Sequence, residues 1–98
     1  MIVITGSVLA RSETLKELTA VCIAHSARSR GEPGCIAHNC HVDCENPLRI
    51  FFYEQWVDRD AIATHFRVPE SLAFMGDLRR LGDVSAAMGI YETTPIKI

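Results

Sequence analysis

The residues best suited to chemistry lie close together between Ile50 and Phe66. This stretch begins as a run of apolar and aromatic side chains that contains Glu54, and His65 follows in the next element. A carboxyl group buried among aromatic side chains has a raised pKa, and a histidine titrates near neutrality. Together they could take a proton from a small molecule and return it, which is general acid–base catalysis.

Aromatic side chains alternate with the carboxylate along this stretch. Phe52 and Trp56 share one face of the expected strand with Glu54, because side chains two residues apart point the same way. They could stack on a planar substrate, or they could simply fill a core.

Each titratable candidate also has an ordinary structural interpretation. Glu54 could pair with Arg49, and His65 could be a core histidine that is hydrogen-bonded to a backbone carbonyl. His25 lies one helical turn beyond Cys22 on an apolar stripe. It could reach the same pocket, or it could sit half-buried near the end of its helix, where it would favour the helix dipole.

A second cluster of histidine and cysteine, at residues 38–44, suggests a metal site, but its spacing argues against one. In a strand, residues two apart lie about 6.5 Å apart and residues four apart about 13 Å apart. Zinc needs ligands at about 2.0–2.3 Å from a common centre. Cys44 therefore cannot join His38 and Cys40, and His41 faces the other way. We expect no metal, and His41 remains a candidate pocket or interface residue.

The flanking sequence predicts the elements that hold these residues. Apolar periodicity and turn residues predict strands at 2–10, 35–43, 49–57 and 84–94, a helix over 12–31 capped by Ser12, a short helix from Asp58 and a helical segment from Pro69 that stops at 82–83. The order β-α-β-β-α-β predicts an α+β fold of the ferredoxin-like type, with a four-stranded antiparallel sheet and helices on one face. Residues 1–98 form a single domain.

The third strand is apolar on both faces, which such a sheet does not explain by itself. Ile50, Phe52 and Trp56 alternate with Phe51 and Tyr53. A strand with one face in water alternates apolar and polar residues instead. We therefore expect a homodimer that packs the two open sheet faces together as a barrel-like sandwich.

Composition narrows the functional classes. A net charge of −2 without a basic run argues against nucleic-acid binding. No apolar segment approaches the roughly 20 residues of a membrane span, and the N-terminus does not resemble a signal peptide. The four cysteines are expected to be free thiols. We expect a cytoplasmic protein with a small-molecule substrate.

Several fragments in order resemble the antibiotic biosynthesis monooxygenase family. They are Glu32-Pro33-Gly34-Cys35, His41-Val42-Asp43, Pro47, Phe52-Tyr53-Glu54-Gln55-Trp56, and the run from Ala61 through His65 to Pro69. The resemblance implies a dimeric α+β barrel with a pocket between helices and sheet. It also implies chemistry on quinols or aromatic polyketides without a cofactor, haem degradation, or isomerisation of a phosphorylated signalling molecule.

The sequence departs from two of these patterns. Phe52 stands where the aromatic-polyketide oxygenases have Asn, and the stretch 71–77 lacks the axial histidine of the haem-degrading members. Tyr53, Glu54 and His65 do match the pattern of the isomerase, for which Arg67 would be a candidate phosphate ligand.

The leading hypothesis is an oxygenase without metal, flavin or haem. His65 or Glu54 would deprotonate a phenol or quinol, whose anion reacts with O₂, and Trp56, Phe52, His25, His41 and Tyr53 would bind the substrate. The alternatives are an isomerase of a small carbonyl compound and a dimeric ligand-binding module without catalysis.

Overall fold

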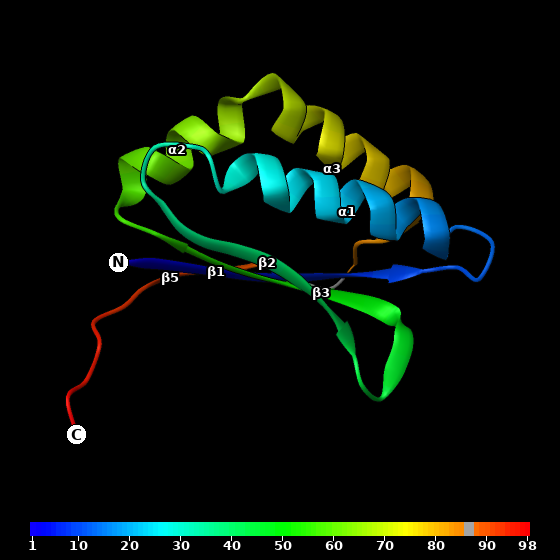
Figure 1. Cartoon of the computed structure of the whole chain (residues 1–98), viewed down its shortest axis with the longest axis horizontal. Coiled ribbons are helices and arrows are strands. Elements are labelled where there is room, and N and C mark those ends of the chain that lie inside the picture. Colours follow the sequence, from blue (N-terminus) through cyan, green and yellow to red (C-terminus); the bar gives the residue numbers. More distant parts are fainter. Residues whose placement is uncertain (86–87) are drawn as a thin grey trace.

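The computed structural model describes residues 1–85 and 88–98. Its elements are β1 (Ile2–Ala10), α1 (Leu15–Ser29), β2 (Cys35–Asp43), β3 (Asn46–Trp56), α2 (Arg59–Arg67), α3 (Pro69–Leu81), β4 (Gly82–Asp83) and β5 (Gly89–Glu92). The antiparallel sheet has the order β2-β3-β1-β4, and β5 also pairs with β1. All helices lie on one face of the sheet, which is not closed (Figure 1). The predicted α+β, ferredoxin-like fold is confirmed.

Three predicted boundaries were wrong. The third strand, predicted to begin at residue 49, begins at Asn46. The last strand, predicted over 84–94, is two short strands, β4 and β5, that pair with opposite ends of β1, and residues 86–87 of the predicted strand lie outside the described part of the chain. Ser12 does not cap α1. The N-cap position is Thr14, whose hydroxyl instead donates to the carbonyl of Leu81, 2.6 Å away. A tertiary contact to the end of α3 therefore takes the side chain that local capping rules would use.

The other helix signals behave as their chemistry requires. The Asp58 carboxylate accepts a hydrogen bond from the backbone N–H of Ala61 at 2.9 Å and so caps α2. Pro69 occupies the first turn of α3, where its missing N–H costs nothing. Gly34 adopts φ = 84° in the turn before β2, a conformation that favours glycine.

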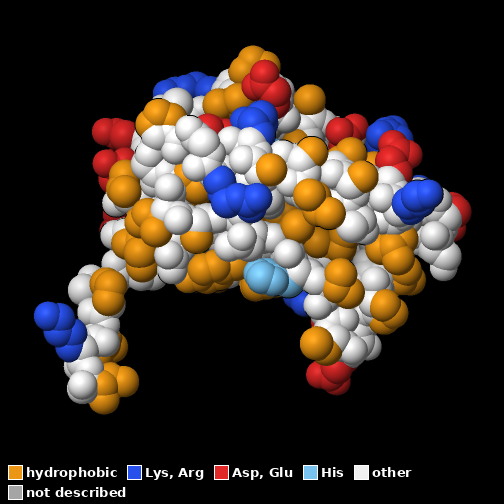
Figure 2. Space-filling model, in the orientation of Figure 1, with side chains coloured by type: hydrophobic (Ala, Val, Ile, Leu, Met, Phe, Trp, Pro, Cys, Tyr) orange, Lys and Arg blue, Asp and Glu red, His pale blue; other side chains and the backbone are white. Residues whose placement is uncertain are grey.

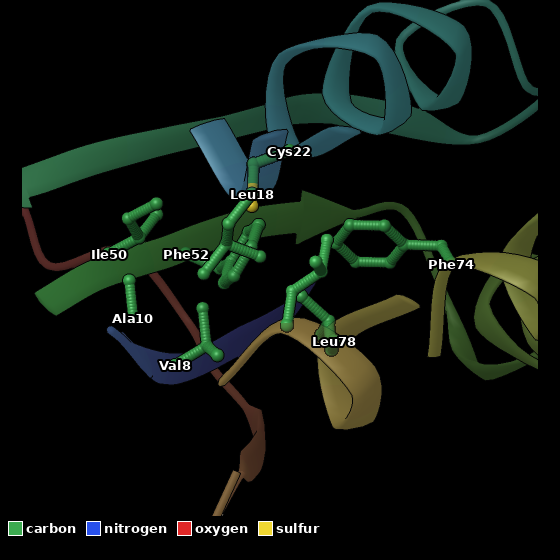
Figure 3. Packing of buried hydrophobic residues seen from close by; sticks show 9 residues of the cluster. Val8, Ala10, Leu18, Cys22, Ile50, Phe52, Phe74 and Leu78 are labelled. Atoms are coloured by element: carbon green, nitrogen blue, oxygen red, sulfur yellow. The ribbon is translucent and has the colours of Figure 1, made fainter. Parts of the chain in front are cut away.

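The buried face of the sheet carries two apolar clusters. The larger one packs β1 and β3 against α1 and α3, and Figure 3 shows Phe52 lying among Leu18, Cys22, Phe74 and Leu78. The smaller one joins Ile2, Ile4 and Trp56 to Ile62 on α2. The alternation along β3 is as predicted, since its even-numbered residues from 50 to 56 are all buried.

In the single chain, none of the described helices covers the opposite face of the sheet (Figure 1). Phe51 and Tyr53 of β3 point to this face and are partly exposed. They pair with His41 and Asn39 of β2, which are exposed as well. Figure 2 shows hydrophobic side chains along the underside of the molecule, beneath the sheet. None of the described helices is long and apolar enough to cross a membrane.

Candidate functional site

A cavity of about 320 Å³ lies between the helices and the sheet. Its walls are mostly apolar, and its polar groups come from β1, α1, β3, α2, α3 and the segment after β4. The lining residues that matter to the chemistry are His25, Phe52, Glu54, His65, Ser71, Phe74 and Met75. Among the described residues that line it there is no lysine or arginine.

Glu54 lies at the polar end of this cavity and is buried. Its Oε1 accepts a hydrogen bond of 2.9 Å from the indole N–H of Trp56, and its Oε2 lies 3.4 Å from Nε2 of His38. Burial raises the pKa of Glu54, against the opposing effects of the Trp56 hydrogen bond and of nearby His65. Glu54 therefore stays protonated to a higher pH than a carboxyl group in water does. Arg49 pairs with Asp43, so the expected structural pairing with Glu54 does not form.

His65 is held by a carboxylate. Its Nδ1 lies 2.8 Å from Oε1 of Glu32, and the other oxygen of Glu32 accepts a hydrogen bond of 2.6 Å from Arg28. Glu32 stands in the turn that follows α1, and α2 brings His65 to it. A histidine whose Nδ1–H is bound by a carboxylate has its Nε2 lone pair free to accept a proton.

His25 faces the same cavity from α1. Its ring stacks on Phe74 with centroids 3.8 Å apart, and its Nδ1 lies 3.0 Å from Nη2 of Arg28. Burial lowers the pKa of His25 to about 3, with further lowering by His38, His65 and Arg28. His25 is therefore a neutral imidazole at ordinary pH.

His38 completes the polar cluster from β2. It is fully buried, its Nδ1 lies 3.0 Å from the hydroxyl oxygen of Ser26, and its Nε2 has no hydrogen-bond partner among the described residues. Burial, followed by the charges of His65, Arg30 and Arg28, lowers the pKa of His38 to about 4. The His38 ring is therefore neutral at ordinary pH, and its contact with Glu54 is not a salt bridge.

The predicted site residues divide into two groups. His25, Phe52, Glu54 and His65 line the cavity. Trp56 lies behind them, fully buried, and reaches the site through Glu54. Tyr53 and His41 belong to the other face of the sheet. Neither they nor Trp56 line the cavity, because strand alternation turns the first two away and the indole is sealed in the core.

Four residues of the polar cluster were not among the predicted site residues: Ser26, Arg28, Glu32 and His38. His38 was considered only as a metal ligand. One signal was available: Arg28 lies three residues after His25, a spacing at which side chains on a helix meet.

The structure brings together a different set of possible metal ligands from the one considered in the sequence. The residues considered at 38–44 do not converge, since His41 points to the open face and Cys44 is exposed. Instead His25, His38 and His65 each bring one ring nitrogen within 4.8 Å of the others. Three imidazoles at this separation could hold a metal after a modest closure, but Arg28 already occupies Nδ1 of His25.

Known proteins share this architecture. The family model for antibiotic biosynthesis monooxygenases matches residues 1–77. The chain belongs to the antibiotic biosynthesis monooxygenase family. Membership of this family, abbreviated ABM, supports a general monooxygenase-like role but does not identify the substrate.

Individual ABM-like relatives are distant in sequence. An uncharacterized protein of Synechocystis sp. is 31% identical over 91 residues, which is 93% of this chain. The chain spans only 62% of that relative's length. A candidate antibiotic biosynthesis monooxygenase of Deinococcus radiodurans has a TM-score of 0.93 at 23% identity, covering 100% of this chain and 98% of its own. A protein of Shewanella oneidensis has a TM-score of 0.85 at 25% identity, covering 92% and 87%.

Proposed function

We propose that this protein is an oxygenase that acts on a small, uncharged aromatic hydroxyl compound such as a quinol, without a bound cofactor. The observation that carries the proposal is the Glu32–His65 pair on the wall of an apolar cavity. It supplies an oriented base in a site that is otherwise suited to an aromatic ring.

The reaction balances with O₂ as the only co-reactant. His65 takes the hydroxyl proton of the quinol, and a ring carbon of the resulting anion donates electrons to O₂ and forms a C–O bond. The hydroperoxide then loses water as its O–O bond breaks, so that quinol and O₂ give hydroxyquinone and H₂O. Glu54, whose pKa is raised by burial, can provide the proton that the departing oxygen needs.

The lining disfavours the phosphorylated substrate of the isomerase hypothesis. Phosphate is normally bound by arginine, lysine or a loop of backbone N–H groups. None of the described lining residues is basic apart from histidine, and Arg67 is exposed at the end of α2. An uncharged aromatic ring therefore fits this cavity better than a phosphorylated carbonyl compound does.

Oxygen uptake by the purified protein tests the proposal. With 1,4-naphthohydroquinone or a related quinol, we expect uptake above the spontaneous rate and a hydroxylated product. His65→Gln and Glu54→Gln should lower the rate, and Glu70→Gln, on the exposed first turn of α3, is the matched control. If no quinol or anthrone in a panel is consumed faster than without protein, a ligand-binding module without catalysis is the better description.

We also propose that two chains pair through their open sheet faces. The partly exposed Phe51 and Tyr53 support this assembly, since a soluble monomer rarely exposes a broad apolar face. Sedimentation at micromolar concentration should show a dimer that Tyr53→Glu weakens, whereas Ile23→Glu on the exposed side of α1 leaves it intact. A wild-type protein that sediments at 10.9 kDa would contradict this assembly. The cytoplasmic location stays a prediction.

A further inference from the structure

Two ring nitrogens at the cavity have no hydrogen-bond partner among the residues that the structure describes. His25 and His65 both line it, and each uses Nδ1 for a contact with Arg28 or Glu32. Among the described residues, the polar side-chain atoms that are sealed from solvent without a partner are Ser29 Oγ and His38 Nε2. Both rings line the cavity and use Nδ1 for these contacts, so Nε2 is the nitrogen that each ring can offer to a bound molecule.

Arg28 decides which nitrogen of His25 carries the proton. A guanidinium group has only donors, so at 3.0 Å the Nδ1 of His25 must be an acceptor without a proton. Since His25 is neutral, its single proton resides on Nε2. The free nitrogen of His25 is therefore an N–H donor.

Glu32 places the proton of His65 on the other ring nitrogen, Nδ1. The Glu32 carboxylate accepts a hydrogen bond of 2.6 Å from the Arg28 guanidinium, and a carboxylate only accepts hydrogen bonds. The Nδ1 of His65, 2.8 Å from Glu32, must then carry a proton. In the neutral ring, Nε2 is left as a lone pair. One arginine thus sets both rings, directly for His25 and through Glu32 for His65.

We propose that Arg28 and Glu32 hold His25 and His65 as a donor and an acceptor that together bind one substrate hydroxyl group. The hydroxyl oxygen accepts from Nε2–H of His25, and its proton is directed at Nε2 of His65. This assignment rests on the proposed function and names the chemistry that its site selects. A hydroxyl group can accept from the N–H of His25 and donate to the lone pair of His65. An ether oxygen can only accept, and an aromatic amine offers no oxygen to the His25 donor.

The arrangement also stabilises the anion. When the proton moves to His65, the oxygen becomes negative while Nε2–H of His25 still points at it, as a donor in an oxyanion hole does. The imidazolium of His65 meanwhile lies against Glu32. His25 itself stays neutral among the groups that face it, which are Arg28, His38, His65 and, across the cavity, Glu54. A neutral histidine donor adds no competing acid to the site.

A metal bridging the three histidines would require a different set of protons. Metal ligation through Nε2 of His25 moves its proton to Nδ1, where it would meet Arg28 donor to donor. The two arrangements are therefore exclusive, and a metal assay separates them.

The protonated nitrogens can be read directly by ¹⁵N-detected histidine spectra of the purified protein. We expect His25 to carry its proton on Nε2 and His65 on Nδ1. Arg28→Met should release the constraint, so that an Nδ1–H form of His25 appears, whereas Arg79→Met, which removes an exposed arginine of α3, leaves the pattern unchanged. If Arg28→Met does not fold, Glu32→Gln tests the same idea at His65, whose proton can then move to Nε2.

Binding of 4-nitrophenol reports on the site without any oxygen chemistry, because its anion absorbs visible light. We expect the bound phenol to ionise at lower pH than the free one, and 4-nitroanisole to bind at least about tenfold more weakly. His25→Phe should abolish the shift and lower kcat/KM for a quinol about a hundredfold, the scale of one lost oxyanion donor. His25→Gln, which keeps an N–H donor, should recover part of both.

The outcomes keep this inference separate from the proposed function. Failure of oxygen uptake with the expected spectra and phenol shift would overturn the oxygenase and leave the hydroxyl site standing. A proton on Nδ1 of His25 in the wild type would overturn the hydroxyl site. Equal binding of nitrophenol and nitroanisole, or stoichiometric binding of zinc or iron, would do so as well.

Discussion

The neutral histidines His25 and His38 should make the protein sensitive to mild acid. In the unfolded chain a histidine has a pKa near 6.5, whereas burial lowers the pKa of His25 to about 3 and of His38 to about 4. Below pH 6.5 the unfolded state therefore binds protons that the folded state does not. The contribution of these histidines to the free energy of unfolding has its full value at and above neutral pH, and it falls as the pH drops from 6.5 toward 4.

The expected size follows from proton linkage. Each proton bound only by the unfolded state contributes a slope of about 1.4 kcal/mol per pH unit, so His25 and His38 together give about 2.7 kcal/mol per unit. Glu54 acts in the opposite direction, because its raised pKa makes the folded state hold a proton that the unfolded chain releases above pH 4.5. A loss of roughly 2–4 kcal/mol between pH 7 and pH 5 results, a large share of a typical domain's stability.

Urea unfolding at a series of pH values and a fixed protein concentration measures this loss. His38→Gln keeps a polar partner for Ser26 and should reduce the slope near pH 5 by about one proton, or 1.4 kcal/mol per pH unit. Glu70→Gln is the matched control, because the side chain of Glu70, on the exposed first turn of α3, meets water in both states. A stability that is flat between pH 7 and pH 5, or a slope unchanged in His38→Gln, would refute the reasoning.

Three further variants test the scaffold and the carboxyl group. Gly34→Ala should cost roughly 1–3 kcal/mol in urea unfolding, because φ is positive and a new Cβ would lie 2.6 Å from Cβ of Ala61; unchanged stability would contradict the strained turn. Asp58→Ala should cost about 1 kcal/mol by the same assay through loss of the α2 cap, and Asp58→Asn should retain most of it. Glu54→Gln should raise the melting temperature at pH 8 and lose that advantage at pH 5, because it removes a carboxyl group whose ionisation burial opposes; equal gains at both pH values would contradict the raised pKa.

The sequence predicted the fold well where local chemistry and global packing agree. The alternation of β3, the cap at Asp58 and the proline that opens α3 each require only neighbouring residues. It failed at Thr14 and at the last strand. The hydroxyl of Thr14 donates to the carbonyl of Leu81, 67 residues away, and the last strand is two short strands that pair with opposite ends of β1.

The sequence predicted the two titratable residues that line the cavity, Glu54 and His65, but not the residues that hydrogen-bond to them. Glu54 stood out because a charged residue in an aromatic strand is unusual, and His65 because a histidine that can move a proton follows in the next element. Glu32 and His38 did not, because a carboxylate beside a Pro-Gly turn and a histidine in a strand are both ordinary. Only the pairing of β2 with β3 places His38 opposite Glu54, and only the packing of α2 brings His65 to Glu32.

The arrangement of the core gives an independent reason to regard these residues as a site. The apolar core is split into a cluster around Phe52 and a cluster around Trp56, and Glu54 lies between these two residues on the same face of β3. Burying polar side chains there costs free energy that a leucine or phenylalanine would not. A fold that only needed stability would join the two clusters. This chain instead places a carboxyl group and three histidines at that level and connects them to an apolar cavity, an arrangement typical of sites that move protons.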